Sequence, residues 1–219
     1  MIQSLEGKNM IKTNKRVLKL HSEKDVLTLL KEKSQGKKNA LKFITLSIGI
    51  VNQDEINWAV DFAIRSINNF LERAITKKSI ENSFNVGNRK PPSKFYKKRA
   101  FDSFSGKQVK DFIRGGVYKI ELTQNLKDRK KYNLHLHVLC EAGFLPQSFI
   151  SYIWHNVLSK PFQGKNILSR GIVDIQSVGD TESDIINTYD YLIKPVPEIR
   201  NGNFKNTRLL SKFGTWYNR

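Results

Sequence analysis

The sequence has one cysteine, no long apolar run and few acidic residues, and each shortage excludes a class of protein. Cys140 has no partner for an internal disulfide, and one thiolate cannot complete the usual closed zinc site. No apolar run approaches the roughly 20 residues that cross a bilayer. Residues 1–17 are basic but lack the apolar centre of a secretory signal. We therefore expect a protein of a reducing cytoplasm.

The shortage of acidic residues leaves a large positive charge. Lys and Arg number 38 against 20 Asp and Glu, a formal net charge of +18. Such a balance attracts a polyanion, of which nucleic acid is the commonest. A basic surface that serves only solubility is the alternative reading.

Much of this charge falls in residues 77–114, which hold eleven basic and three acidic side chains, a net +8. Pro91 and Pro92 interrupt regular structure there, and aromatic residues alternate with the cations. We interpret the segment as an insertion that neutralises phosphates and stacks bases on its rings. The alternative is a disordered insertion with no specific contact. The candidate nucleic-acid-binding residues are Lys90, Lys94, Tyr96, Lys97, Lys98 and Arg99.

Apolar periodicity predicts an alternation of strands and helices. We expect strands at residues 42–51, 115–124, 133–141 and 170–178, and helices at 22–33, 54–75, 146–160 and 182–194. Helices against an antiparallel sheet of four or five strands make an α+β fold. The expected organisation is a basic arm with a short helix (1–40), a main domain (41–195) that contains the insertion, and a C-terminal tail (196–219).

Residues 133–141, NLHLHVLCE, alternate apolar and polar side chains. Because side chains two apart on a strand share a face, Leu134 and Leu136 point one way and His135 and His137 the other. Helices are expected to cover the leucine face, which leaves the histidine face open. Two neutral imidazoles about 7 Å apart at their Cα atoms can converge on one divalent ion. Two solvated histidines are the ordinary alternative.

The strand at 115–124 offers a third ligand. Tyr118, Ile120 and Leu122 form its apolar face, so Glu121 lies on the opposite one. If this strand pairs with the histidine strand, Glu121 can reach the same ion. Two nitrogens and a carboxylate suit Mn²⁺ or Mg²⁺ and leave positions open for phosphate oxygens.

The helix at 182–194 supplies a candidate nucleophile. Tyr189 belongs to its apolar stripe and is expected in the core. Tyr191 lies about 200° further around the helix, on the polar face, where it is either a surface residue or the group that attacks phosphorus. A free phenol has a pKa of about 10, so Lys194 or a metal-held phosphate is expected to help it lose its proton.

Four motifs now show a family resemblance. NLHLHVLCE resembles the His-hydrophobic-His motif of the HUH endonucleases, and FITLSIG, GGVYKIELTQN and YDYLIKP are similar to motifs of the rolling-circle replication initiators (Rep proteins) of plasmids and viruses. GIVDIQSV is similar to a later core strand of that family. The resemblance covers roughly residues 40–195.

The resemblance implies a ferredoxin-like or RNA-recognition-like fold, a five-stranded antiparallel sheet with helices on one face. It implies that Glu121, His135 and His137 hold the ion and that Tyr191 attacks a DNA phosphodiester. A 5′-phosphotyrosyl link and a free 3′-OH for priming would result, in the cytoplasm of a prokaryotic host.

Some features depart from the family pattern. Asn187 occupies the position where one plasmid subgroup has a glutamate that activates water, so termination by that route is not expected. Tyr189 and Tyr191 are not one helical turn apart, which favours a single nucleophile. No phosphate-binding loop of an NTPase is present, so the expected partners are single-stranded DNA or an origin hairpin, a separate helicase and a host polymerase.

Two other readings stay open. A conjugative relaxase or a single-strand transposase would use the same chemistry. A non-catalytic nucleic-acid-binding module, similar to an RNA-recognition domain, would instead need aromatic residues on exposed strands. The expected open face carries Thr45, Ser47, Glu121, His135 and His137, which favours the enzyme.

Overall fold

The structure is a computed structural model that describes residues 28, 32, 41–85, 93–167, 169, 171–179, 181–193 and 210–216. All statements below concern these residues. The predicted helix at 22–33 lies outside them apart from Thr28 and Glu32, as do Lys90 and Lys194.

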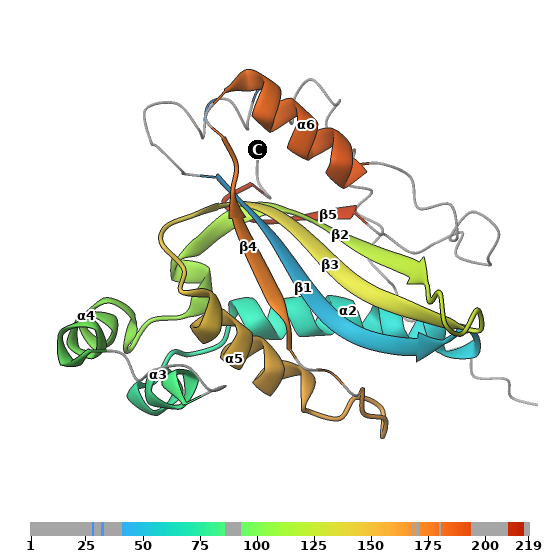
Figure 1. Ribbon diagram of the computed structural model, residues 1–219, viewed down its shortest axis with the longest axis horizontal. Coiled ribbons are helices and arrows are strands. Elements are labelled where there is room, and N and C mark those ends of the chain that lie inside the picture. Colours follow the sequence, from blue (N-terminus) through green and yellow to red (C-terminus); the bar gives the residue numbers. More distant parts are fainter. Residues whose placement is uncertain are drawn as a thin grey trace, which may run out of the picture.

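The centre of the molecule is one open antiparallel sheet of five strands in the order β4-β1-β3-β2-β5 (Figure 1). The expected α+β fold with a five-stranded antiparallel sheet is therefore confirmed. Its strands are β1 (Leu41–Asn52), β2 (Ile113–Gln124), β3 (Lys131–Ala142), β4 (Val173–Ser177) and β5 (Leu210–Gly214).

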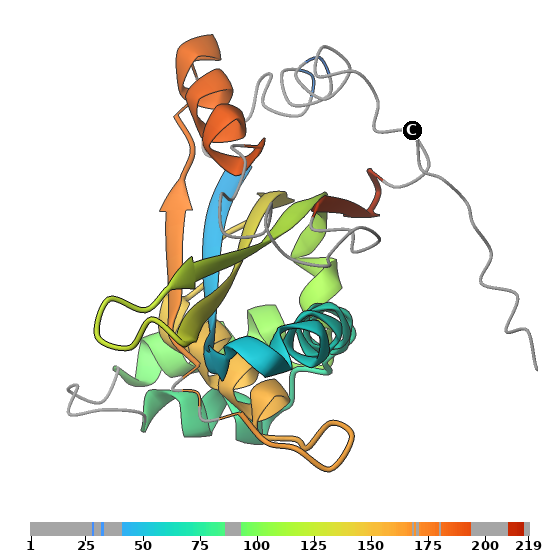
Figure 2. The same cartoon turned by 90° about the vertical axis from the view of Figure 1, so that its right-hand side faces the viewer.

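Two helices cover the leucine face of the sheet, as the alternation in β3 predicts. They are α2 (Ile56–Leu71) and α5 (Gln147–Leu158), which lie below the sheet in both views (Figures 1 and 2). Apolar residues of α2 recur every three or four positions, and those that face the sheet are buried. The indole of Trp154 on α5 donates a hydrogen bond of 2.7 Å to the carbonyl of Ser47, which ties this helix to β1.

The register of β1 against β3 shifts between Ser47 and Gly49. Gly49 has φ 152°, a conformation that a residue with a Cβ rarely adopts. An extra residue of this kind bends a strand locally, and bulges often lie beside functional sites. Here the bulge directly follows the two polar residues of β1, Thr45 and Ser47, that lie on the histidine face.

A third helix, α6 (Glu182–Ile193), packs on the histidine face, above the sheet in both views (Figures 1 and 2). We expected helices on one face alone and an open histidine face. Helix α6 instead covers part of the histidine face. The reason is that part of the histidine face is apolar and needs a cover. The small core between α6 and the sheet consists of Leu41, Val117, Leu139, Val178, Ile185, Tyr189, Leu192 and Trp216.

The fifth strand comes from the segment that we expected to be a tail. β5 pairs with β2 in the register Gly116↔Phe213, and both Phe213 and Trp216 are buried. The sheet therefore extends beyond the expected domain end at residue 195.

The basic segment is folded on both sides of residues 86–92. Helix α3 (Lys77–Phe84) is capped at its N-terminus by Thr76, whose hydroxyl accepts a hydrogen bond from the backbone N–H of Ser79. Helix α4 (Lys94–Phe104) is capped at its N-terminus by Ser93, whose hydroxyl accepts a hydrogen bond from the backbone N–H of Tyr96. The structure thus has two capped helices where the sequence pattern favoured a loop. Within the described residues, no helix is long and apolar enough to cross a membrane.

Candidate active site on the histidine face

The pairing of three strands gathers the polar residues on one patch. Glu121 of β2 lies opposite His135 of β3, and Lys119 lies opposite His137. On the other side of β3, β1 brings Ser47 opposite His135 and Thr45 opposite His137. The pairing of the two strands that carry Glu121 and the histidines is therefore confirmed. These residues form a polar patch on the histidine face: Thr45, Ser47, Lys119, Glu121, His135 and His137.

His137 is held from both of its ring nitrogens. Its Nε2 donates a hydrogen bond of 2.7 Å to Glu121 Oε2, and its Nδ1 lies 3.2 Å from Thr45 Oγ1. With Nε2 as the donor, Nδ1 of the neutral ring accepts the hydroxyl hydrogen of Thr45. The side chain is 7% exposed, so these two bonds satisfy a buried polar group and fix its orientation.

The same hydrogen bond keeps Glu121 ionised. It is the largest cause that lowers the pKa of Glu121, against the opposing effect of burial, and the nearby charge of Lys119 acts in the same direction. Lys119 is itself buried in this face. Lys119 was not selected as a site residue from the sequence. Its position two residues before Glu121 on the same strand is the signal that places it on this face.

His135 is the third candidate ligand, after Glu121 and His137. Its ring centre lies 6.4 Å from that of His137. Burial, followed by the neighbouring His137, lowers the pKa of His135, so the neutral imidazole dominates near pH 7. Neutral imidazole is the form that binds metals.

The donor atoms fit a divalent cation in part. Within the described residues, no three side chains of His, Cys, Asp and Glu converge as a ready metal site. Glu121 Oε2 and His137 Nε2 are nevertheless 2.7 Å apart. In this hydrogen bond Nε2 carries the proton, so the pair would hold an ion only with that proton moved to Nδ1 and the lone pair of Nε2 free. His135 is the third donor on the same face.

Tyr191 reaches this patch from α6. Its ring centre lies 5.6 Å from that of His137, nearly perpendicular at 85°, and 5.7 Å from that of Phe43. Tyr191 is 52% exposed, whereas Tyr189 is buried in the core, as the helical spacing predicted for both. Partial burial, and then the charge of Glu121, raises the pKa of Tyr191. The phenol therefore needs a proton acceptor or a cation before it can act as a nucleophile.

Phe43 was missed by the sequence reasoning. Its ring stacks on His137 at 5.5 Å and 17°, and it meets the edge of Tyr191. Its position two residues before Thr45 on β1 is the signal that places it on this face. Beside it, a cleft of about 500 Å³ opens between α6 and strands β1 and β4. Gln176, Asp184, Asn187 and Tyr191 contribute to its walls.

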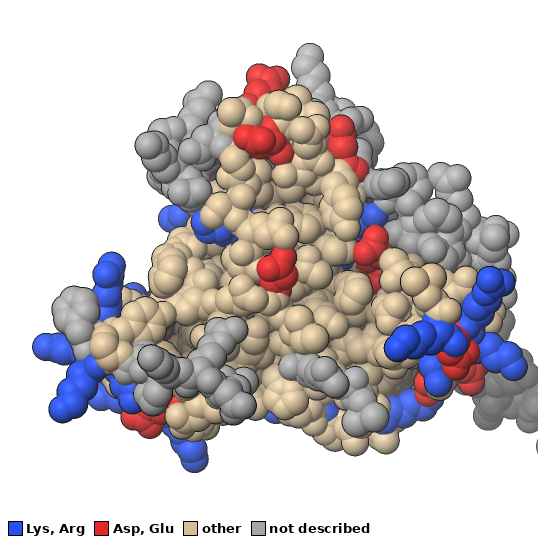
Figure 3. All heavy atoms as spheres, viewed as in Figure 1, with Lys and Arg blue, Asp and Glu red and all other residues tan. Residues whose placement is uncertain are grey.

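The expected nucleic-acid-binding residues do not border this site. Lys94, Tyr96, Lys97, Lys98 and Arg99 lie on α4, below the sheet and on the side opposite α6 (Figures 1 and 2). Helix α6 itself carries three acidic residues and no Lys or Arg. In the space-filling view, Lys and Arg gather around α4 and around the β2–β3 turn, while Asp and Glu mark α6 (Figure 3).

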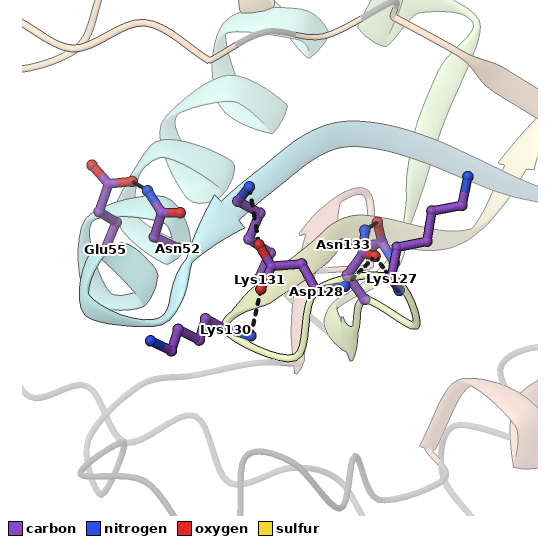
Figure 4. A network of polar contacts seen from close by, with 8 residues as sticks. Asn52, Glu55, Lys127, Asp128, Lys130, Lys131 and Asn133 are labelled. Atoms are coloured by element: carbon purple, nitrogen blue, oxygen red, sulfur yellow. Dashed lines mark hydrogen bonds and ion pairs between the residues drawn. The ribbon is translucent and has the colours of Figure 1, made fainter.

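The β2–β3 turn is the basic surface that continues from the site strands. Asp128 orders it through hydrogen bonds and an ion pair: its Oδ1 accepts from the N–H of Lys130 at 3.1 Å, and its Oδ2 lies 3.1 Å from Lys131 Nζ (Figure 4). Lys131 is four residues from His135, or about 13 Å along the strand. The turn therefore presents cations within a few nucleotides of the histidine face.

Comparisons with protein families, with curated proteins and with solved structures gave no match to this chain.

Proposed function

We propose that the protein is a divalent-cation-dependent, site-specific nickase and ligase that cuts one DNA strand by attack of Tyr191 and initiates rolling-circle replication. The observation that carries the proposal is the position of Tyr191, whose ring lies on the same face of the sheet as the Glu121–His137 pair and 5.6 Å from His137. A nucleophile beside donor atoms for a cation is the arrangement that phosphoryl transfer needs.

The proposed reaction exchanges one phosphodiester for another. Tyr191 Oη bonds to phosphorus, the bond from phosphorus to the 3′ oxygen breaks, and that oxygen takes up a proton and becomes the free 3′-OH. The phenolic proton passes to a base, a step for which we propose that Lys194 lowers the cost by stabilising the phenolate. Rejoining reverses these steps, so no external energy source is required.

The chain would hold the cation with Glu121, His137 and His135. When bound, Mn²⁺ or Mg²⁺ would polarise the scissile phosphate and stabilise the charge that develops on it. The Thr45–His137 contact keeps the His137 ring in a fixed orientation, and the lowered pKa of Glu121 keeps that carboxylate in its ligand form.

The DNA would approach Tyr191 from the β2–β3 turn. Helix α6 carries only negative charge, whereas the turn carries Lys127, Arg129, Lys130 and Lys131. Phosphates are attracted to the turn and repelled by α6, which defines the side of entry. The proposed partners remain single-stranded DNA or an origin hairpin, a separate helicase and a host polymerase.

The test is the covalent intermediate. The protein is incubated with Mn²⁺ and a pool of labelled single strands and hairpins, and adducts that survive denaturation are separated by gel electrophoresis. We expect an adduct with the native chain and with Tyr189→Phe, and none with Tyr191→Phe. An adduct that persists in Tyr191→Phe would refute the role of this residue.

Cation binding is tested separately by calorimetry with Mn²⁺. We expect Glu121→Gln, which keeps the side-chain shape, and the double variant His135→Ala/His137→Ala to lose binding. Circular dichroism checks that each variant keeps the fold. Unchanged Mn²⁺ affinity in a folded variant would count against the site.

A further inference from the structure

A second hollow lies on the opposite side of the sheet from Tyr191. It measures about 450 Å³ and opens between α4 and the connection from β3 to α5. That volume is within the range of sites for small ligands, about 300–1,000 Å³. Its walls include Tyr96, Arg99, Phe104, Phe112 and Phe144.

Aromatic rings make up most of this hollow. The rings of Phe104 and Phe112 contact each other, with centres 4.9 Å apart, and Phe104 is buried. At the rim, Phe144 is 73% exposed and Tyr96 is 38% exposed. The hollow therefore has a packed aromatic base and two accessible rings at its mouth.

Cations surround the rings. Helix α4 carries four basic residues and one acidic residue, and Arg99 lines the hollow itself. The ammonium of Lys107 lies over the ring of Phe112, 5.4 Å from its centre. The matching ligand combines a flat apolar surface with negative charge. An unpaired nucleotide has both, because its base stacks on rings and its phosphate pairs with cations.

We propose that this hollow receives an unpaired base of a single DNA strand whose phosphates lie along α4. The inference rests on DNA as the ligand in the proposed function, but not on the cleavage step. It gives the chain a holding point for DNA on the side of the sheet away from the nucleophile. Substitutions here would weaken the capture of a long strand and leave the reaction at Tyr191 intact.

The test is done in a Tyr191→Phe chain, which keeps cleavage out of the measurement. Fluorescence anisotropy compares an oligothymidylate with an abasic strand of the same length, since both have the same phosphates. We expect the oligothymidylate to bind about tenfold more tightly or better. Phe144→Ala should remove most of this preference, whereas Ile172→Ala, which truncates an exposed apolar residue outside both the hollow and the β2–β3 turn, should keep it.

The phosphate contact has its own readout. Arg99→Ala should weaken both strands and make the slope of log K against log salt shallower by about 0.7. Arg73→Ala removes an exposed arginine outside the hollow and should leave the slope unchanged.

Three results would overturn the inference. These are equal binding of the two strands by the parent chain, equal effects of Phe144→Ala and Ile172→Ala, and a self-association in ultracentrifugation that only Phe144→Ala abolishes. The last would make the hollow an interface between two copies. Base-dependent binding through Phe144 in the Tyr191→Phe chain, together with no adduct from the native chain in the covalent assay, would support the hollow and refute the nickase, so the two failures are distinguishable.

Discussion

The two faces of the sheet are built from the same strands but carry different kinds of side chain. On the face toward α2 and α5, β3 presents Leu134, Leu136 and Val138, which are completely or almost completely buried. On the opposite face, the same strand presents His135 and His137 and, further along, the buried Leu139 under α6. Alternation along one strand thus separates the residues of the main core from those of the candidate site.

On the histidine face, hydrogen bonds between side chains compensate for the burial of polar groups. The Glu121–His137 hydrogen bond and the Thr45–His137 contact satisfy side chains that would otherwise be costly to remove from water. The apolar face needs few such bonds. We therefore expect neighbouring residues on one strand to differ sharply in their response to substitution.

The largest effect is expected for Leu136→Ala, compared with His135→Ala one residue away. Leu136 is fully buried against the helices, and its truncation leaves a cavity, so unfolding should become easier by about 2–5 kcal/mol. His135→Ala should cost less than about 1 kcal/mol. Urea denaturation of both variants measures the difference. Equal losses would contradict the division between the faces.

The next effect concerns the two indoles that donate to carbonyls. Trp154→Phe removes a buried hydrogen bond of 2.7 Å to Ser47 and should destabilise the fold by about 1–3 kcal/mol. Trp58→Phe removes a longer bond of 3.2 Å, from a partly exposed ring to Phe162, and should cost less. Thermal unfolding compares them, and a larger loss for Trp58→Phe would reverse the expected order.

A smaller effect is the pH dependence that the histidine face adds. Because the pKa of His135 is lowered in the folded chain, the unfolded chain binds this proton more readily, and stability falls as the pH drops below about 6.5. Glu121 has a lowered pKa too, so its contribution is present above about pH 4.5 and is lost as the pH falls through the lowered value. Urea denaturation at about pH 7.5 and 5.5 should show a decline that His135→Gln reduces. A variant with an unchanged decline would remove His135 as its cause.

The smallest effect is expected at the hairpin turn that joins the two site strands. Leu126 is fully exposed, so Leu126→Ala should change the free energy of unfolding by no more than about 0.5 kcal/mol. It makes the same chemical change as Leu136→Ala within the same hairpin. A loss near that of Leu136→Ala would mean that Leu126 packs against the protein in solution.

The strands and their faces could be predicted from the sequence because a period of two residues is a local property. It placed Leu136 and His137 on opposite faces, and it placed Glu121 on the histidine side before the pairing of the strands was known. The helical period likewise separated Tyr189 from Tyr191. These are the residues on which the candidate site depends.

Other features depend on contacts that no local pattern records. The apolar stripe of α6 predicts that one side is buried, but not against which face of the sheet, and Leu139 was the sign that the histidine side also needed cover. β5 is five residues long and forms only where it meets β2. The caps at Thr76 and Ser93 mark the starts of α3 and α4, but the prolines and cations between them favoured a loop.

Strand β5 also lowers the tendency of the molecule to associate with other copies of itself. β5 covers Gly115 to Lys119 of β2 and, with five residues, makes a shorter edge of the sheet than the twelve-residue β2 would. An edge strand presents unpaired amide and carbonyl groups that recruit strands from other molecules, and a short edge presents fewer of them. A chain shortened before residue 210 would expose the edge of β2, together with the apolar surface that Trp216 covers. We expect such a chain to precipitate, although β5 carries none of the candidate site residues.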